Sequence, residues 1–184
     1  MEAKDYLEQH WMKNKIWTHL GWPKHQDRFR TCVSYLEGKR FIDVGCGLGH
    51  STNILKKFLP GDWSGFEFMQ EATNKAKELF PNITFYYSPD FNFLPICGKF
   101  DGVICSEVIE HVENDQALIK GLIEITKKVL VITTPNKRVS DPGHLRVYTE
   151  ESLSKLFDGY NFEIVRDGIF FYGIIRITKK GKVL

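Results

Sequence analysis

Short apolar runs alternate with amphipathic stretches along most of the chain. The runs are rich in Val, Ile and Phe and are too short for helices, which is typical of strands buried on both faces of a sheet. They lie at Arg40–Val44, Trp63–Glu67, Ile83–Tyr87, Asp101–Ser106 and Val129–Thr133. Because these runs alternate with segments of helical spacing, the pattern predicts mostly parallel strands joined by helices on both faces of one sheet.

The amphipathic segments place apolar residues on one side at helical spacing, with polar residues between them. Helices are expected at Lys4–Lys13, Gln26–Leu36, Gln70–Phe80, Asn114–Thr126 and Thr149–Phe157. Another is expected between the strand at Arg40–Val44 and Pro60, with Ile54, Leu55, Phe58 and Leu59 on one face. Local signals mark some of their ends. Pro81 follows one segment, and Thr149 is a suitable N-cap with Glu150 in the first turn after it.

The C-terminal tail breaks the alternation. Phe162–Arg166 and Phe171–Thr178 are expected to be strands with no helix between them, so they should pair as a hairpin. This adds one antiparallel strand to the sheet. The predicted fold class is therefore α/β, a Rossmann-like three-layer sandwich with a seven-stranded, mostly parallel sheet. We expect a single domain over residues 1–184, with N-terminal helices over 1–38 and the core over 39–184.

Composition and charge narrow the function classes. The formal net charge is +2, which gives no strong basic field for nucleic acid. The cysteines are Cys32, Cys46, Cys97 and Cys105. None forms a C-x-x-C pair, so zinc and thioredoxin-type chemistry have no support and a reduced, cytoplasmic compartment is expected. Residues 1–10 are polar, unlike a signal peptide, and the apolar stretches are too short to span a bilayer, so no membrane partner is expected.

A glycine-rich loop, Asp43–Gly49 (D-V-G-C-G-L-G), ends one apolar run and opens a helix. Glycines allow close approach of backbone to a ligand, and a helix N-terminus offers free N–H groups. Alone, the loop fits any nucleotide-like cofactor or a plain tight turn. Three details favour S-adenosylmethionine over NAD: the G-x-G-x-G spacing, an acid at Asp43 to meet the cofactor's amino group or a water bound to it, and a chain too short for a separate substrate domain.

Glu67 ends the second apolar run of the core. An acid at this place can accept hydrogen bonds from ribose hydroxyls. Phe68 and Met69 follow it and could flank an adenine ring. The alternative is a solvated strand end, which the position of Glu67 disfavours.

Several segments occur in the order found in a known family. They are F-I-D-V-G-C-G-L-G-H, G-F-E-F-M, S-P-D-F-N-F-L-P-I, F-D-G-V-I-C-S-E-V-I-E-H-V and V-L-V-I-T-T-P-N. From about Phe41 onward the chain resembles the class I S-adenosylmethionine-dependent methyltransferases, in particular the E-V-I-E-H group with its ubiquinone-type O-methyltransferases. The resemblance implies S-adenosylmethionine as cofactor and S-adenosylhomocysteine as product. The cofactor-binding residues it implies are Asp43, Gly45, Gly47, Gly49, Glu67, Asp90, Phe91 and Ser106. We add Cys46, Phe68 and Glu107 to the predicted cofactor-binding residues.

One position departs from the family pattern. The family often has G-D before the adenine contact, whereas this chain has Pro89 before Asp90. Proline fixes the backbone there and removes a donor N–H.

Glu107, Glu110 and His111 stand at i, i+3 and i+4, so on a helical turn they would share one face. They are expected to point into the cleft beside the methyl group, where the loop that carries His144 also opens. Three interpretations stay open. A histidine is a general base for an acceptor hydroxyl, the four side chains bind a divalent cation, or the cluster is structural.

Catalytic roles are predicted for His111, His144 and Glu110, and no metal is predicted. A cation set on E-x-x-E-H plus a later His resembles that of the small-RNA 3′-terminal 2′-O-methyltransferases. The sequence after Pro135, however, lacks the F-R-H-x-D-H type run expected in that family. Its H-L-R-V-Y-T segment looks like that of the small-molecule members.

Aromatic residues gather before the first core strand. His10, Trp11 and Trp22 could form a lid over the cofactor, or they could pack on the sheet. The lid hypothesis predicts that deleting residues 1–22 leaves a folded protein with much weaker cofactor binding.

The predicted function is methyl transfer from S-adenosylmethionine to a small-molecule acceptor, with O-methylation favoured and nucleic acid not indicated. The alternatives are a non-catalytic S-adenosylmethionine-binding module in a larger assembly and a metal-dependent RNA 2′-O-methyltransferase. A nicotinamide-dependent oxidoreductase is disfavoured by the loop spacing and the chain length.

Overall fold

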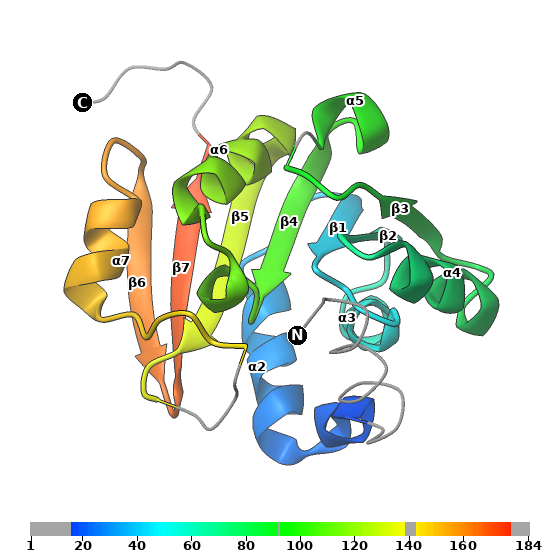
Figure 1. The fold of residues 1–184 in the computed structure, drawn as a ribbon, viewed down its shortest axis with the longest axis horizontal. Coiled ribbons are helices and arrows are strands. Elements are labelled where there is room, and N and C mark those ends of the chain that lie inside the picture. Colours follow the sequence, from blue (N-terminus) through cyan, green and yellow to red (C-terminus); the bar gives the residue numbers. More distant parts are fainter. Residues whose placement is uncertain (1–15, 92, 139–142, 178–184) are drawn as a thin grey trace.

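A computed structural model describes residues 16–91, 93–138 and 143–177 and contains one sheet of seven strands (Figure 1). The strands are β1 (Arg40–Val44), β2 (Asp62–Glu67), β3 (Thr84–Tyr87), β4 (Phe100–Ser106), β5 (Thr126–Pro135), β6 (Phe162–Asp167) and β7 (Phe170–Arg176). Their order is β3-β2-β1-β4-β5-β7-β6, and β7 runs antiparallel to both of its neighbours. The predicted sheet, with one antiparallel strand from a terminal hairpin, is confirmed.

The helices lie on both sides of this sheet (Figure 1). They are η2 (Ile16–Gly21), α2 (Pro23–Ser34), α3 (His50–Phe58), α4 (Gln70–Leu79), α5 (Leu94–Cys97), η3 (Ile109–His111), α6 (Asp115–Ile125) and α7 (Glu150–Leu156). Leu122 of α6 and Leu153 of α7 belong to one buried cluster, whereas Phe29 of α2 and Leu55 of α3 belong to another. Two separate apolar clusters with the sheet between them make the three-layer sandwich.

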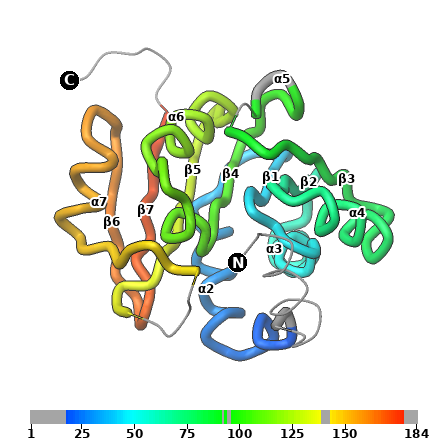
Figure 2. Tube along the Cα trace, in the orientation of Figure 1, coloured from blue at the N-terminus to red at the C-terminus, as the bar shows by residue number. Residues whose placement is uncertain are grey.

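The chain reverses its path across the sheet between β1 and β4. It runs outward from β1 to the edge strand β3 and returns through α5 to β4, which can be followed in Figure 2. In a doubly wound sheet, the crevice at this reversal is where ligands bind, outside the carboxyl ends of the strands. The glycine loop leaves β1 there, and η3 follows β4.

Several elements begin or end elsewhere than the sequence pattern predicts. Helix α2 starts at Pro23, before the predicted Gln26, because proline suits the first helical turn and Trp22 serves as N-cap. Strand β5 starts at Thr126, directly after α6, although Lys127 and Lys128 are exposed. The helix predicted over residues 4–13 lies outside the described residues.

The cap predicted at Thr149 is confirmed, with an added reciprocal bond. The Thr149 hydroxyl accepts from the Ser152 N–H, and the Ser152 hydroxyl accepts from the Thr149 N–H. Over the described part of the chain, no helix is both long enough and apolar enough to cross a membrane.

Candidate functional site

Three glycines shape the loop after β1. Gly45, Gly47 and Gly49 have φ of 79°, 54° and 80°, in the left-handed region that side chains disfavour. The N–H groups of Gly45 and Cys46 both donate to the Phe66 carbonyl, at 2.8 and 3.1 Å. The loop is therefore held against the end of β2. Glycine occupies the positions of the loop that need the left-handed conformation.

Glu67 ties the glycine loop to the end of β2. One carboxylate oxygen accepts from the Gly47 N–H at 2.7 Å. The other accepts from the N–H groups of Phe68 at 2.8 Å and Met69 at 3.2 Å. Burial raises the pKa of this carboxyl, against the opposing effect of these hydrogen bonds. Its predicted contact with a ribose stays a prediction, and its shown role is to hold the loop.

Asp43 is buried one residue before the last residue of β1. Its Oδ2 accepts from the hydroxyls of Ser51 at 2.6 Å and Thr52 at 2.9 Å, both in the first turn of α3. The carboxylate thus fixes the start of the helix that follows the loop. Cys46 is also buried, and burial raises the pKa of its thiol, which disfavours a reactive thiolate.

The predicted adenine side of the site contains aromatic residues from two loops. The rings of Phe68 and Phe91 meet nearly edge to face, with centroids 5.7 Å apart. Asp90 is exposed, and its Oδ1 accepts from the Ser88 hydroxyl at 2.9 Å. These residues lie beyond the ends of β2 and β3, and their contact with the cofactor stays a prediction.

Glu107 does not lie on a helical face with Glu110 and His111, so that prediction is wrong. It precedes η3 with φ at 59°, and its N–H donates to the Thr133 carbonyl at 2.9 Å. Its Oε1 accepts from the Thr133 hydroxyl at 3.0 Å, which in turn lies 2.8 Å from the Ser106 hydroxyl. This left-handed turn between β4 and η3 holds the carboxylate against Thr133, outside the group that Glu110, His111 and His144 form.

Arg28 of α2 is the partner of Glu107, and the sequence analysis missed it. Its Nη1 lies 3.4 Å from Glu107 Oε2, and the side chain is 4% exposed. The guanidinium also stacks over the rings of Phe29 and Phe170, at 5.0 and 4.8 Å. The sequence feature that could have predicted its burial is its spacing from Cys32, which is buried four residues later on the same face of the helix.

His25, one turn before Arg28, makes the packing of α2 sensitive to pH. It lies against Phe170, and burial, aided by the Arg28 charge, lowers its pKa from 6.5 to about 3. The fold favours neutral His25, so its contribution to stability is complete above about pH 6.5 and is lost as pH falls toward 3. The melting temperature should therefore fall between pH 7 and pH 5, and less so in His25→Phe. Parallel curves for the two proteins would contradict this account.

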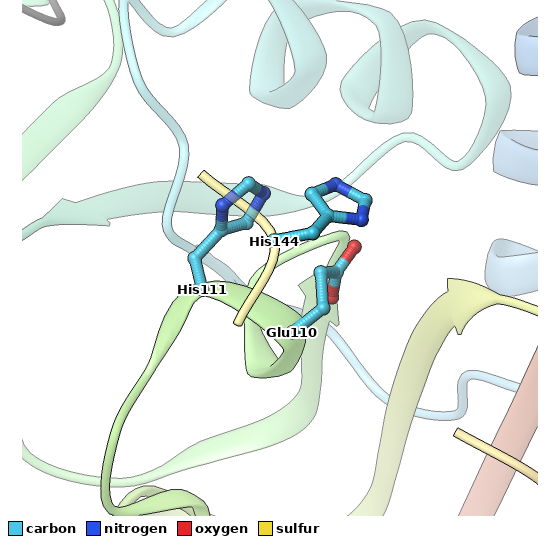
Figure 3. A group of neighbouring side chains, drawn as sticks. All are labelled: Glu110, His111 and His144. Atoms are coloured by element: carbon cyan, nitrogen blue, oxygen red, sulfur yellow. The ribbon is translucent and has the colours of Figure 1, made fainter. Parts of the chain in front are cut away.

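Glu110, His111 and His144 come together beyond the end of β4 (Figure 3). Glu110 and His111 belong to η3, whereas His144 arrives in the segment after β5. The rings of the two histidines stand edge to face with centroids 4.6 Å apart. The structure thus brings together the three residues predicted to be catalytic.

The segment that carries His144 is fastened to η3 by several hydrogen bonds. His111 Nδ1 lies 3.0 Å from the Gly143 carbonyl, and the Leu145 N–H donates to the Glu110 carbonyl at 2.8 Å. Further along, Arg146 pairs with Asp115 at 2.6 Å. These contacts hold the three side chains in one arrangement.

Glu110 is the buried member of the three. It is 0% exposed, and among the described residues neither carboxylate oxygen has a hydrogen-bond partner. Burial, together with the charge of Glu107, raises the pKa of this carboxyl well above its ordinary value. An ionised carboxylate in this buried position costs free energy. Carboxyl groups with a strongly raised pKa are typical of functional sites.

Comparisons with known proteins agree with this fold. A family model described as a methyltransferase domain matches residues 26–167. A magnesium protoporphyrin IX methyltransferase from Synechocystis PCC 6803, solved with bound S-adenosylhomocysteine, has a TM-score of 0.73 at 18% identity. That match covers 96% of this chain and 98% of the other, and it shows the same fold.

Two curated relatives are more similar in sequence over shorter spans. A ubiquinone biosynthesis O-methyltransferase from Coxiella burnetii is 32% identical over 50% of this chain and 41% of its own length. A trans-aconitate 2-methyltransferase from Afipia carboxidovorans is 28% identical over 61% of this chain and 44% of its own length. The matches thus span less than half of each of these two relatives.

Proposed function

This chain belongs to the methyltransferase domain family, and from that premise we propose that it transfers the methyl group of S-adenosylmethionine to a small-molecule acceptor, preferably at oxygen. The observation that carries the proposal is the loop after β1, which contains three left-handed glycines and whose Gly47 N–H donates to the Glu67 carboxylate. The loop lies at the reversal point of the sheet, beside the N-terminus of α3. Such a site accepts a nucleoside with a charged tail.

The chemistry needs little from the protein beyond positioning. The acceptor oxygen attacks the methyl carbon in line, the C–O bond forms as the C–S bond breaks, and the electron pair stays on sulfur. The sulfonium is already a good leaving group, so orientation and removal of the acceptor's proton are the remaining tasks. Glu110, His111 and His144 lie beyond the end of β4, where they serve to activate the acceptor.

A small acceptor is favoured by the names of the relatives, which include a quinone-pathway enzyme and a trans-aconitate enzyme. The net charge of +2 gives no strong overall basic field for RNA. We keep a non-catalytic cofactor-binding module as the second candidate, because the matched relatives are more than twice as long as the segments that align.

Ligand-dependent melting separates these functions. We expect S-adenosylhomocysteine and S-adenosylmethionine to raise the melting temperature and NAD and NADP to leave it unchanged, because a ligand of the native state alone stabilises the protein. A transfer assay that detects S-adenosylhomocysteine then surveys phenols, small carboxylic acids, amines and RNA. Stabilisation by the nicotinamides alone would overturn the proposal, and cofactor binding with no transfer to any acceptor would favour the non-catalytic module.

A further inference from the structure

The stretch of chain that carries His144 into the site, residues 143–148, belongs to no helix or strand and is here called the His144 segment. Its apolar residues Leu145 and Val147 are 53% and 43% exposed. Tyr148 is the first residue after His144 whose side chain is buried. Because burial of apolar surface contributes little before that point, polar contacts decide where the His144 segment lies.

Asp115, the first residue of α6, fastens the His144 segment at two points. Its Oδ2 accepts from Arg146 Nη1 at 2.6 Å and from the Tyr148 hydroxyl at 2.7 Å. Hydrogen bonds to an ionised carboxylate are stronger than those between neutral groups. The Asp115 side chain is 20% exposed, so water screens its pair with Arg146 only in part. One carboxylate oxygen therefore holds donors from both sides of Val147.

The same two donors also reach the backbone at the two ends of η3. The Tyr148 hydroxyl lies 3.3 Å from the Ile109 carbonyl, and Arg146 Nη2 donates to the Glu113 carbonyl at 2.9 Å. Burial raises the pKa of the Tyr148 hydroxyl, so this group keeps its proton and remains a donor. By orienting both donors, Asp115 joins the His144 segment to the turn that carries the other two site residues.

His144 depends on this junction for its place beside η3. The N–H of Leu145, the next residue, donates to the Glu110 carbonyl at 2.8 Å. The His144 ring meets the His111 ring edge to face, with centroids 4.6 Å apart (Figure 3). We propose that Asp115 is a positioning residue for methyl transfer, which holds the His144 segment against η3 and thereby sets where the acceptor is activated. This inference rests on the proposed function, in which the three site residues serve the acceptor.

Loss of the Asp115 carboxylate should displace the acceptor side of the site and spare the cofactor side. The glycine loop is held separately, by Glu67 at the end of β2. A displacement of about 1 Å at a reacting group can lower a rate by about 100-fold. We therefore expect Asp115→Ala to lower kcat by about 10- to 100-fold, while its affinity for S-adenosylhomocysteine stays within about twofold of the wild type.

Proton NMR of the whole chain with S-adenosylhomocysteine measures the displacement without any acceptor. Each ring of the edge-to-face pair shifts the resonances of the other, and His111→Gln and His144→Gln assign them. Both sets of resonances should move in Asp115→Ala. Tyr148→Phe keeps the buried ring and removes one donor, so it should move them by less. This milder variant provides the test if Asp115→Ala does not fold.

Asp62→Ala is the matched control. Asp62 also pairs with an arginine, Arg40, but the pair is exposed and lies at the first residues of β1 and β2, at the edge of the sheet away from the site. Its loss should leave the histidine resonances, kcat and the affinity for S-adenosylhomocysteine unchanged.

Methyl transfer to the fastest-reacting phenol gives the second readout. A lower kcat with unchanged cofactor affinity, together with shifted resonances, supports the proposal. Unshifted resonances in Asp115→Ala and Tyr148→Phe would overturn it. A parallel fall of kcat and cofactor affinity would also overturn it, because Asp115 would then serve stability alone. If no acceptor reacts with the wild type, the proposed function fails, and the resonances still decide whether Asp115 holds His144 in place.

Discussion

Replacing Glu67 with alanine is expected to abolish cofactor binding and to lower the free energy of unfolding by about 3–5 kcal/mol. This magnitude follows because each buried donor left without a partner costs about 1–3 kcal/mol. The carboxylate accepts from three backbone N–H groups, those of Gly47, Phe68 and Met69. Alanine leaves all three without this acceptor, and the Gly47 N–H is buried. The glycine loop then loses its link to the end of β2, so both the cofactor-binding conformation of the loop and stability are lost.

Urea unfolding and calorimetry with S-adenosylhomocysteine measure the two effects. Glu67→Gln should be intermediate, because an amide oxygen accepts where one carboxylate oxygen did, while the amide NH₂ faces donors. Glu78→Ala is the matched control, since this glutamate is exposed on α4 and pairs with Lys75 at the surface. We expect the control to change stability by less than about 0.5 kcal/mol. A Glu67→Ala protein with wild-type affinity would refute the role of Glu67 in the site.

The sheet was predictable because most strands are buried on both faces and are bounded by glycine or proline. β1 begins and ends at the predicted residues, since Gly45 stops the apolar run. β5 was predicted too short, because exposed Lys127 and Lys128 interrupt the apolar pattern while their backbone still pairs in the sheet. The apolar pattern therefore predicts which residues are buried. It predicts which residues pair in the sheet only where the paired residues are also buried.

The candidate site was less predictable, for a physical reason. The spacing of Glu107, Glu110 and His111 assumed a continuous helix, but Glu107 adopts a left-handed conformation that no sequence signal marks in a residue other than glycine. Its partner Arg28 lies far away in sequence, so spacing could not find the pair. His144 was placed correctly, because the loops after parallel strands open at one edge of the sheet.

The glycine loop and η3 form one packed unit, and a change at Gly45 should show it. A Cβ at Gly45 would lie 2.4 Å from Cγ2 of Val108, and its φ of +79° is strained for any side chain. Gly45→Ala should therefore lower the free energy of unfolding by about 1–2 kcal/mol from the backbone and about 1–3 kcal/mol from the overlap. Because Val108 stands between Glu107 and Glu110, the same change should weaken cofactor binding and disturb the cluster of Glu110, His111 and His144.

A double-mutant cycle separates the two causes. Val108→Ala removes the atoms that the new methyl group of Gly45→Ala would meet. The double variant should therefore regain the free energy lost to the overlap but keep the cost of the backbone strain. We expect a favourable coupling of about 1–3 kcal/mol between the two sites in urea unfolding. Recovery of S-adenosylhomocysteine affinity in the double variant would follow from contact between the loop and η3. A coupling near zero would mean that the loss comes from the backbone of Gly45 alone, and that the cofactor loop and the acceptor side do not communicate through Val108.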